Sequence, residues 1–138
     1  MSVAILLITH GEIGQAIHQA AVSVIGSSPL RTACMSITME TTPEEAFRQA
    51  QQHIERLNTG SGVLVLTDMY GATPSNIACT IQDTDIAIIS GLNLPMLIRV
   101  MNYPSLPLQE LAEKAITGGK EGVIYFHCGE IEDVTQEN

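Results

Sequence analysis

Two polar residues of this sequence, His10 and Asp68, have the chemistry and the placement to act as a pair. Each lies just beyond a run of apolar residues, Val3–Ile8 in the first case and Val63–Leu66 in the second. A carboxylate that bonds to one ring nitrogen of a histidine fixes the tautomer and leaves the lone pair of the other nitrogen free for attack. We therefore predict that the histidine is a nucleophile and that the aspartate orients it.

The segment after the aspartate has the features of an anion-binding loop. Gly71 and Ala72 are small, so the backbone there can approach a ligand closely. Thr73 and Pro74 predict the start of a helix with the threonine as its N-cap, and a helix start presents free N–H groups and a positive dipole end. Thr73 and Ser75 add hydroxyl donors. We expect this loop to accommodate a phosphoryl group on the histidine with no metal ion and no cofactor.

Short apolar runs alternate along the chain with segments of helical period, which is typical of an α/β fold with a parallel sheet. The predicted strands are residues 3–8, 33–38, 63–66, 86–89 and 123–126, and the predicted helices lie at 13–24, from 43 to before Gly60, and at 75–80, 94–101 and 108–117. We expect an open, doubly wound sheet with parallel strands in the order 2-1-3-4, a fifth, antiparallel edge strand, and helices on both faces. In such sheets ligands bind at the carboxyl ends of the strands where the strand order reverses, which is where His10 and Asp68 are expected to lie.

The composition narrows the class of protein. The 138 residues and the 45% apolar content suit a single domain, assigned to residues 1–130, with an acidic C-terminal tail at 131–138. The 15 acidic and 6 basic side chains give a net charge of −9, which disfavours nucleic acids and anionic membranes as partners. No apolar run approaches the roughly 18 residues of a membrane span. Three cysteines without a CxxC motif fit a reduced compartment, so we expect a cytoplasmic protein without membrane insertion.

Three sequence blocks carry a family resemblance; in order, they are AILLITHGEIGQAI, GVLVLTDMYGATPSNIA and ISGLNLPMLIRV. With them the chain resembles, over essentially its whole length, the EIIA domain of the mannose family of the bacterial phosphoenolpyruvate-dependent sugar phosphotransferase system. The resemblance implies that His10 accepts a phosphoryl group from phospho-HPr and passes it to an EIIB domain for sugar uptake, with Asp68 as the orienting partner. It also implies that Thr73 lies near the phosphoryl group and that Asn93 and Pro95 line a neighbouring loop that contacts a ligand or partner.

The sequence departs from the family at a few points. Tyr70 and Ala72 stand where members often have tryptophan and a second glycine, and both changes are mild. The sequence ends at Asn138 without an EIIB domain, so we expect a separate EIIB protein as the acceptor. The alternative is a stand-alone regulatory module in which the phosphorylation state of His10 controls binding to a partner protein, without sugar transport. A hydrolase with the same nucleophile is a weaker alternative, because nothing obvious supplies a general base for water.

Association is a further expectation. Family members similar to this chain are homodimers in which the last strand can be exchanged between subunits, and Gly118-Gly119 would then be the hinge before Gly122–Phe126.

Several of these residues also have simpler interpretations. Asp68 can cap the following turn, and Asn93 and Pro95 can merely start a helix. His18 is expected on the solvated face of the first helix, and no histidine has a companion at metal-ligand spacing, although His127-Cys128 suggests one.

Overall fold

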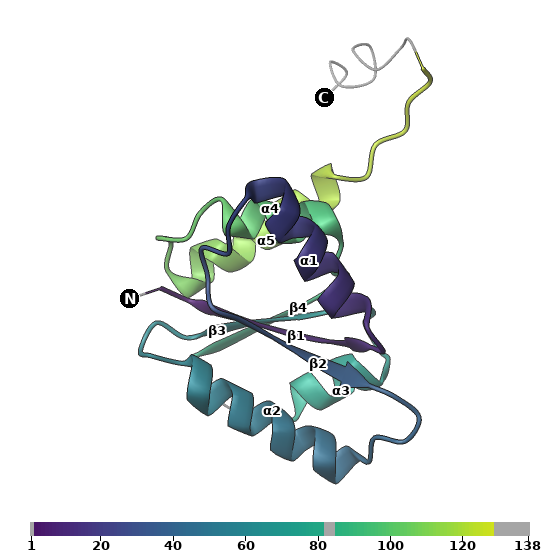
Figure 1. Cartoon of the computed structure of the whole chain (residues 1–138), viewed down its shortest axis with the longest axis vertical. Helices are drawn as coiled ribbons and strands as arrows, with labels where there is room; N and C mark the ends of the chain where they lie inside the picture. The colour runs from purple at the N-terminus through teal and green to yellow at the C-terminus, as the bar shows by residue number, and fades with distance from the viewer. Residues whose placement is uncertain (1, 82–84, 129–138) are drawn as a thin grey trace.

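The computed structural model describes residues 2–81 and 85–128. In this part of the chain a four-stranded sheet lies between two layers of helices (Figure 1). The strands are β1 (Ala4–His10), β2 (Thr32–Ile37), β3 (Val63–Thr67) and β4 (Ile86–Ser90), and the helices are α1 (Ile13–Ile25), α2 (Pro43–Leu57), α3 (Thr73–Cys79), α4 (Leu94–Met101) and α5 (Leu108–Glu121). The predicted acidic tail at 131–138 lies outside the described residues.

The sheet has the order β2-β1-β3-β4 with every neighbouring pair parallel, as the sequence predicts. The central strands are almost continuously apolar because a parallel sheet is covered on both faces. In the register of the sheet, Ile8 of β1 lies beside Thr67 of β3, and Thr67 lies beside Ser90 of β4. The first polar residue beyond β3 is therefore brought level with the end of β1.

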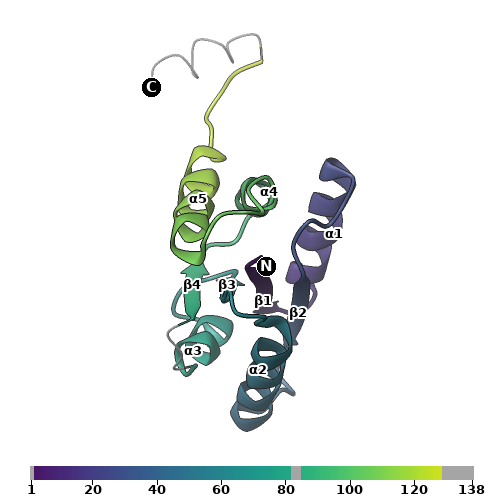
Figure 2. The same ribbon diagram turned by 90° about the vertical axis from the view of Figure 1, so that its left-hand side faces the viewer.

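The helices divide between the two faces of the sheet. Helices α1, α4 and α5 cover one face and α2 and α3 cover the other, as the view along the sheet shows (Figure 2). Alternate residues of each strand serve the two cores, with Leu7 and Leu66 in the first core and Ile8 and Val65 in the second. Each of these four side chains is fully buried. The site at the strand ends therefore rests on a rigid, doubly covered support.

Two helix ends form as the sequence predicts. Thr42 is the N-cap of α2, where its hydroxyl accepts a hydrogen bond from the Glu45 N–H at 3.2 Å, and Pro43 takes the first helical position. Helix α1 ends at Gly26. Within the described residues, no helix combines the length and the apolar character that crossing a membrane requires.

The buried face of α1 differs from the predicted one. The spacing of its apolar residues predicts one inner face, which comprises Ile13, Ala16, Ile17, Ala20, Ala21 and Val24. The structure buries Ala21 fully and Ile17 partly, whereas the side chains of Ile13 and Val24 are exposed. The helix carries two apolar stripes, and contact with the sheet selects the one that includes Gly14 and Ala21.

The Gly118-Gly119 pair is not a hinge. Both glycines are buried inside α5, which continues four residues beyond its predicted end and stops at Glu121. A Cβ added to Gly118 would lie 2.5 Å from the Cβ of Arg99, and one added to Gly119 would lie 2.8 Å from the Cε of Met96. The glycines therefore allow α5 to lie against α4, and the helix has no reason to bend there.

The predicted fifth strand does not form within the single chain. Residues 123–127 continue beyond α5 without regular secondary structure and extend away from the sheet (Figure 1). Four apolar side chains of this segment are exposed, at 78% for Val123, 49% for Ile124, 74% for Tyr125 and 49% for Phe126. The contact of α5 with α4 sends the segment away from the edge of β4, so the sheet of one chain ends at that strand.

Candidate functional site

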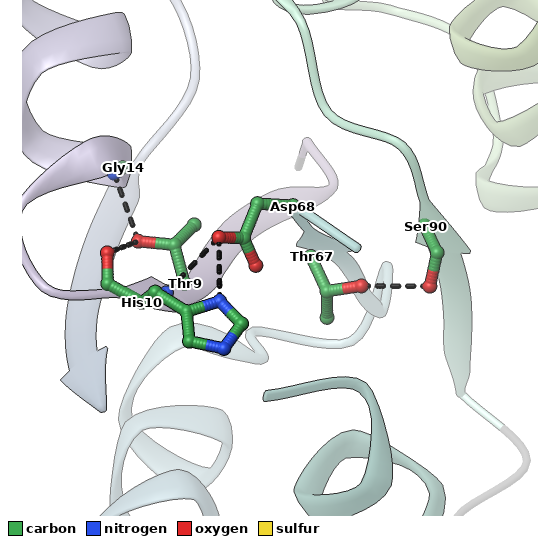
Figure 3. Close-up of polar contacts among 6 residues, drawn as sticks. All are labelled: Thr9, His10, Gly14, Thr67, Asp68 and Ser90. Atoms are coloured by element: carbon green, nitrogen blue, oxygen red, sulfur yellow. Dashed lines mark hydrogen bonds and ion pairs between the residues drawn. The ribbon is translucent and has the colours of Figure 1, made fainter. Parts of the chain in front are cut away.

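His10 and Asp68 meet at the carboxyl edge of the sheet, as the sequence predicts. His10 is the last residue of β1 and Asp68 directly follows β3. The Nδ1 atom of His10 lies 2.9 Å from Oδ2 of Asp68, and the backbone N–H of His10 donates to the same oxygen at 3.1 Å (Figure 3). Because an ionised carboxylate can only accept, Nδ1 carries the hydrogen and the lone pair lies on Nε2. The geometry therefore supplies a histidine with one defined tautomer.

The two side chains differ in their access to solvent. The side chain of His10 is 45% exposed, whereas that of Asp68 is 11% exposed. The Nε2 atom of the ring points away from the aspartate (Figure 3). The second carboxylate oxygen, Oδ1, is buried and has no hydrogen-bond partner within the part of the chain that is described. The aspartate is thus shielded from solvent, whereas the histidine side chain that it contacts stays accessible.

The turn after His10 is held by backbone geometry. Gly11 has a φ of +47°, a conformation that a residue with a Cβ adopts only with strain. Its N–H donates to the carbonyl of Ile37 at 3.0 Å, which ties the turn to the end of β2. The THG sequence therefore places the half-exposed His10 directly before a turn that leads the chain into α1.

The loop after Asp68 leads into α3, which packs against β1 and β3. Tyr70 is 84% exposed, and Gly71 has a φ of +79° in the turn before the helix. The predicted capping by Thr73 is wrong: Ala72 is the N-cap residue and Thr73 is the first helical residue, with an exposed side chain. Pro74 in the first turn favours this boundary because its fixed φ suits the helix and it has no N–H to satisfy.

The hydroxyl groups of the loop have different surroundings. Ser75 is 2% exposed and its hydroxyl lies 3.4 Å from that of Ser90, which in turn lies 2.7 Å from the hydroxyl of Thr67. Within the described residues, the backbone N–H groups of Thr73 and Ser75 have no hydrogen-bond partner. What Ser75 offers a ligand is therefore its N–H, whereas Thr73 offers both its N–H and its hydroxyl.

Asn93 and Pro95 lie at the start of α4. The Asn93 side chain caps this helix, since its Oδ1 accepts from the Met96 N–H at 2.9 Å, and its Nδ2 donates to the Gly119 carbonyl at 3.2 Å. Pro95 lies against Gly122, where an added Cβ would be 2.4 Å from the Cβ of the proline. Both residues hold α4 and α5 together, and their contact with a ligand or partner stays a prediction.

The remaining histidines have other environments. His18 is half-buried rather than solvated, its Nε2 has no partner among the described residues, and burial lowers the pKa of its ring. Burial also lowers the pKa of His53, with a smaller effect from the charge of Arg56. The exposed His127 ring accepts or donates a 2.6 Å hydrogen bond with the hydroxyl of Tyr125. Over residues 2–81 and 85–128, no three His, Cys, Asp or Glu side chains gather as a metal site.

Sequence reasoning missed three residues that support the site. Thr67 and Ser90 are the last residues of β3 and β4, Thr9 is the last but one of β1, and the two threonines are fully buried. The available signal was a polar residue at the end of an otherwise apolar strand, immediately before His10 in one case and Asp68 in the other.

The fold and the site together define an open parallel α/β domain with a carboxylate-oriented histidine where its strand order reverses. Residues 4–116 match the EIIA-man family, described as the PTS system fructose IIA component. The chain belongs to this family and is a mannose-family EIIA component of the phosphotransferase system.

Relatives of known sequence or structure agree with this assignment. The chain is 28% identical over 129 residues to the PTS system mannose-specific EIIAB component of Escherichia coli K12, a match that covers 89% of this chain and 39% of that protein. The chain therefore spans about two fifths of the length of that relative. The mannose/sorbose-specific IIA subunit of the phosphotransferase system from Enterococcus faecalis is similar in structure, with a TM-score of 0.82, 23% identity and coverage of 92% and 96% of the two chains. The phosphotransferase system component EIIA from Streptococcus agalactiae has a TM-score of 0.77 at 25% identity, with coverage of 90% and 97%.

Proposed function

We propose that the protein is a phosphocarrier that accepts a phosphoryl group from phospho-HPr on His10 and passes it to an EIIB domain for sugar uptake. The observation that carries this proposal is the 2.9 Å contact between Nδ1 of His10 and Asp68, on a histidine whose side chain is 45% exposed. A lone histidine at a strand end has many structural uses, but a fixed tautomer with an accessible lone pair suits a nucleophile. In this role we expect the protein in the cytoplasm.

The transfer is an in-line displacement between two imidazoles. The lone pair on Nε2 of His10 attacks phosphorus, a new N–P bond forms, and the N–P bond of the donor phosphohistidine breaks with its electron pair returning to the donor ring. The Nδ1 hydrogen of His10 stays on its nitrogen, and the Asp68 carboxylate stabilises the positive charge that develops on the ring. Such a transfer requires positioning and charge stabilisation more than acid–base chemistry.

The loop at the start of α3 is the proposed contact for the phosphoryl oxygens. Gly71 and Ala72 allow close approach, and the unpartnered N–H groups of Thr73 and Ser75 are donors for an anion. The exposed hydroxyl of Thr73 adds a further donor. The exposed Tyr70 and the start of α4 at Asn93 and Pro95 are proposed contacts for the HPr or EIIB surface.

We further infer a homodimer in which residues 123–126 supply the missing fifth strand, antiparallel to β4 of the partner subunit. Strand β4 is the edge of the sheet, and an apolar groove beside it is lined by residues that include Ile89, Ile116 and Val123. An exposed strand edge and an exposed apolar segment are both liabilities in solution, and pairing one with the other removes both.

Incubation with phosphoenolpyruvate, enzyme I and HPr, followed by intact mass, tests the phosphocarrier. One added phosphoryl group, labile in acid and stable in base, is expected on the wild type and on the control His53→Gln but not on His10→Ala. Full labelling of His10→Ala contradicts the assignment. Labelling of the wild type without onward transfer to any EIIB favours the regulatory alternative.

A further inference from the structure

Thr9, which directly precedes His10, has a fully buried hydroxyl that connects two elements of the site. The hydroxyl oxygen accepts a hydrogen bond from the N–H of Gly14 in α1 at 2.9 Å. Its hydrogen is donated to the carbonyl oxygen of His10 at 3.3 Å (Figure 3). A hydroxyl without partners is costly to bury, and here both of its functions are used.

The bond to Gly14 replaces a missing helix cap. The N-cap residue of α1 is Glu12, and its side chain makes no capping hydrogen bond. The first N–H groups of a helix have no partner within the helix, so one of them is satisfied here from the strand before the turn. Thr9 therefore fixes the start of α1 relative to the end of β1, where His10 is the last residue.

The first turn of α1 packs closely against the end of β1. A Cβ added to Gly14 would lie 3.2 Å from Oγ1 and 3.3 Å from Cγ2 of Thr9, and 3.3 Å from the Cβ of Leu7. The first turn of α1 thus rests directly on the threonine side chain. A shift of the helix start would move the Thr9 hydroxyl and, with it, the acceptor at the His10 carbonyl.

The two sides of the His10 backbone are held by different residues. Asp68 accepts from its N–H at 3.1 Å, and Thr9 donates to its carbonyl at 3.3 Å. With both peptide groups fixed, the direction of the Cα–Cβ bond is fixed, and Asp68 then needs to select one orientation of the ring. The peptide group that carries the His10 carbonyl is also held by the Gly11 N–H bond to the Ile37 carbonyl at 3.0 Å, so loss of the Thr9 bond is expected to loosen this direction rather than to abolish it.

We propose that Thr9 is a positioning residue for phosphoryl transfer: its hydroxyl fixes the His10 backbone so that Nδ1 stays on Asp68 and Nε2 faces the incoming phosphoryl group. The inference rests on the proposed phosphocarrier function and assigns that site a residue that does not touch the phosphoryl group. Its effect is exerted through the His10 backbone and the tautomer of the ring.

The test compares Thr9→Val, which keeps the shape and removes the hydroxyl, with Thr9→Ser, which keeps the hydroxyl. The control is Thr32→Val, because the Thr32 hydroxyl donates to the Leu30 carbonyl at 3.0 Å at the start of β2, the opposite edge of the sheet. Two quantities are measured: the single-turnover rate of transfer from phospho-HPr, and the ¹⁵N chemical shifts of the His10 ring, which report the tautomer.

We expect Thr9→Val to transfer about tenfold more slowly, equivalent to a barrier about 1.4 kcal/mol higher, and to populate a second tautomer. Thr9→Ser and Thr32→Val are expected to match the wild type in both measurements. If Thr9→Val does not fold, Thr9→Ala against Thr9→Ser gives the same comparison. A wild-type rate and tautomer in the variant without the hydroxyl overturn the proposal.

The two measurements separate this proposal from the phosphocarrier function. If phospho-HPr does not label the wild type, the phosphocarrier proposal fails, whereas the ring shifts of Thr9→Val still show whether the hydroxyl positions His10. If the wild type is labelled and the variant is unchanged, the role of Thr9 alone is wrong.

Discussion

The carboxyl edge of the sheet and the segment after α5 contrast in how far a single chain completes them. At the edge, His10 and Asp68 lie at the ends of neighbouring strands, and the backbone N–H and Nδ1 of His10 both bond to one carboxylate oxygen of Asp68. A fully buried threonine precedes each of the two residues. After α5, residues 123–126 are apolar and 49–78% exposed, and no strand among the described residues pairs with them. The register of the sheet completes the first region, whereas the apolar side chains of the second are left exposed in the single chain.

This difference separates what is local to one subunit from what depends on association. The position of His10 depends on β1 and β3 and on the turn into α1, none of which includes residues of the C-terminal segment. We therefore expect changes at the sheet edge to alter phosphoryl transfer, and changes in residues 123–126 to alter the oligomeric state.

The largest expected effect comes from Asp68→Asn, which removes the carboxylate that contacts Nδ1 of His10 at the sheet edge. An amide can donate as well as accept, so it no longer forces the hydrogen onto Nδ1 of His10. We expect the rate of transfer from phospho-HPr to fall on the order of 1,000-fold, within the usual range for loss of a group that stabilises charge in the transition state. Rapid-quench labelling measures this rate, and Glu113→Gln on α5 is the control. An unchanged rate would show that the pairing has no role in transfer.

Phe126→Asp tests whether residues 123–126 form the proposed dimer contact. Burial of one phenylalanine side chain contributes about 1.5–3 kcal/mol, and the proposed dimer buries two copies, so we expect the dissociation constant to rise roughly 100-fold or more. Sedimentation equilibrium measures it. The control is Met39→Asp, because Met39 is fully exposed in the turn between β2 and α2. If the Phe126→Asp dimer is as stable as the wild-type dimer, the pairing of residues 123–126 with the partner subunit is contradicted. If the wild type is monomeric, the dimer itself is contradicted.

Gly118→Ala distinguishes a hinge from a packed helix in α5, the helix that precedes residues 123–126. At a mobile hinge, alanine would favour the helix by up to about 1 kcal/mol. In the packed helix the new methyl group meets Arg99, and we expect a loss of about 2 kcal/mol in the free energy of unfolding. Urea unfolding distinguishes the two signs, with Thr117→Ala as the neighbouring control on α5. A stabilised variant would restore the hinge interpretation.

The smallest expected effect concerns pH. Burial lowers the pKa of His18 below its usual value of 6.5, so the unfolded chain binds this proton more readily than the folded one. Stability from this group is therefore present above pH 6.5 and is lost as the pH falls through that value. We expect His18→Gln to lose less stability than the wild type between pH 7.5 and pH 5.5 in urea unfolding, with His127→Gln as the control. An equal or greater loss would contradict the assignment.

The parts of the fold that depend on local pattern could be predicted from the sequence. Strand order and the meeting of His10 with Asp68 follow from apolar runs and parallel topology, and the Thr42 cap follows from its neighbours. The inner face of α1 could not be predicted fully, because a helix with two apolar stripes needs the sheet to select between them. The contact of Thr9 with α1 could not be predicted either: the polar residue at the end of an apolar strand is visible in the sequence, but its partner is the backbone N–H of Gly14, which residue type does not reveal.

The hinge expected at Gly118-Gly119 is wrong for a different physical reason, whereas the fifth strand and the dimer stay predictions. A pair of glycines indicates a flexible joint when nothing lies nearby, and a close helix contact when side chains of a neighbouring helix lie against it. Only the position of Arg99 and Met96 distinguishes the two cases, since these side chains occupy the space that each Cβ would need. Because α5 continues through Gly118-Gly119 to Glu121, residues 123–127 extend away from the sheet of their own chain.

The single oxygen of Asp68 that accepts from both the ring and the backbone of His10 gives the protein a built-in spectroscopic reporter. Phosphorylation at Nε2 is expected to make the Nδ1–H group of His10 a stronger hydrogen-bond donor to Oδ2 of Asp68. The bond from the backbone N–H of His10 to the same oxygen is then expected to weaken. The amide proton of His10 is then expected to move upfield when the phosphoryl group arrives and to return when it leaves. One backbone resonance would follow the loading of the carrier in real time, without a label on phosphorus and without interrupting the reaction.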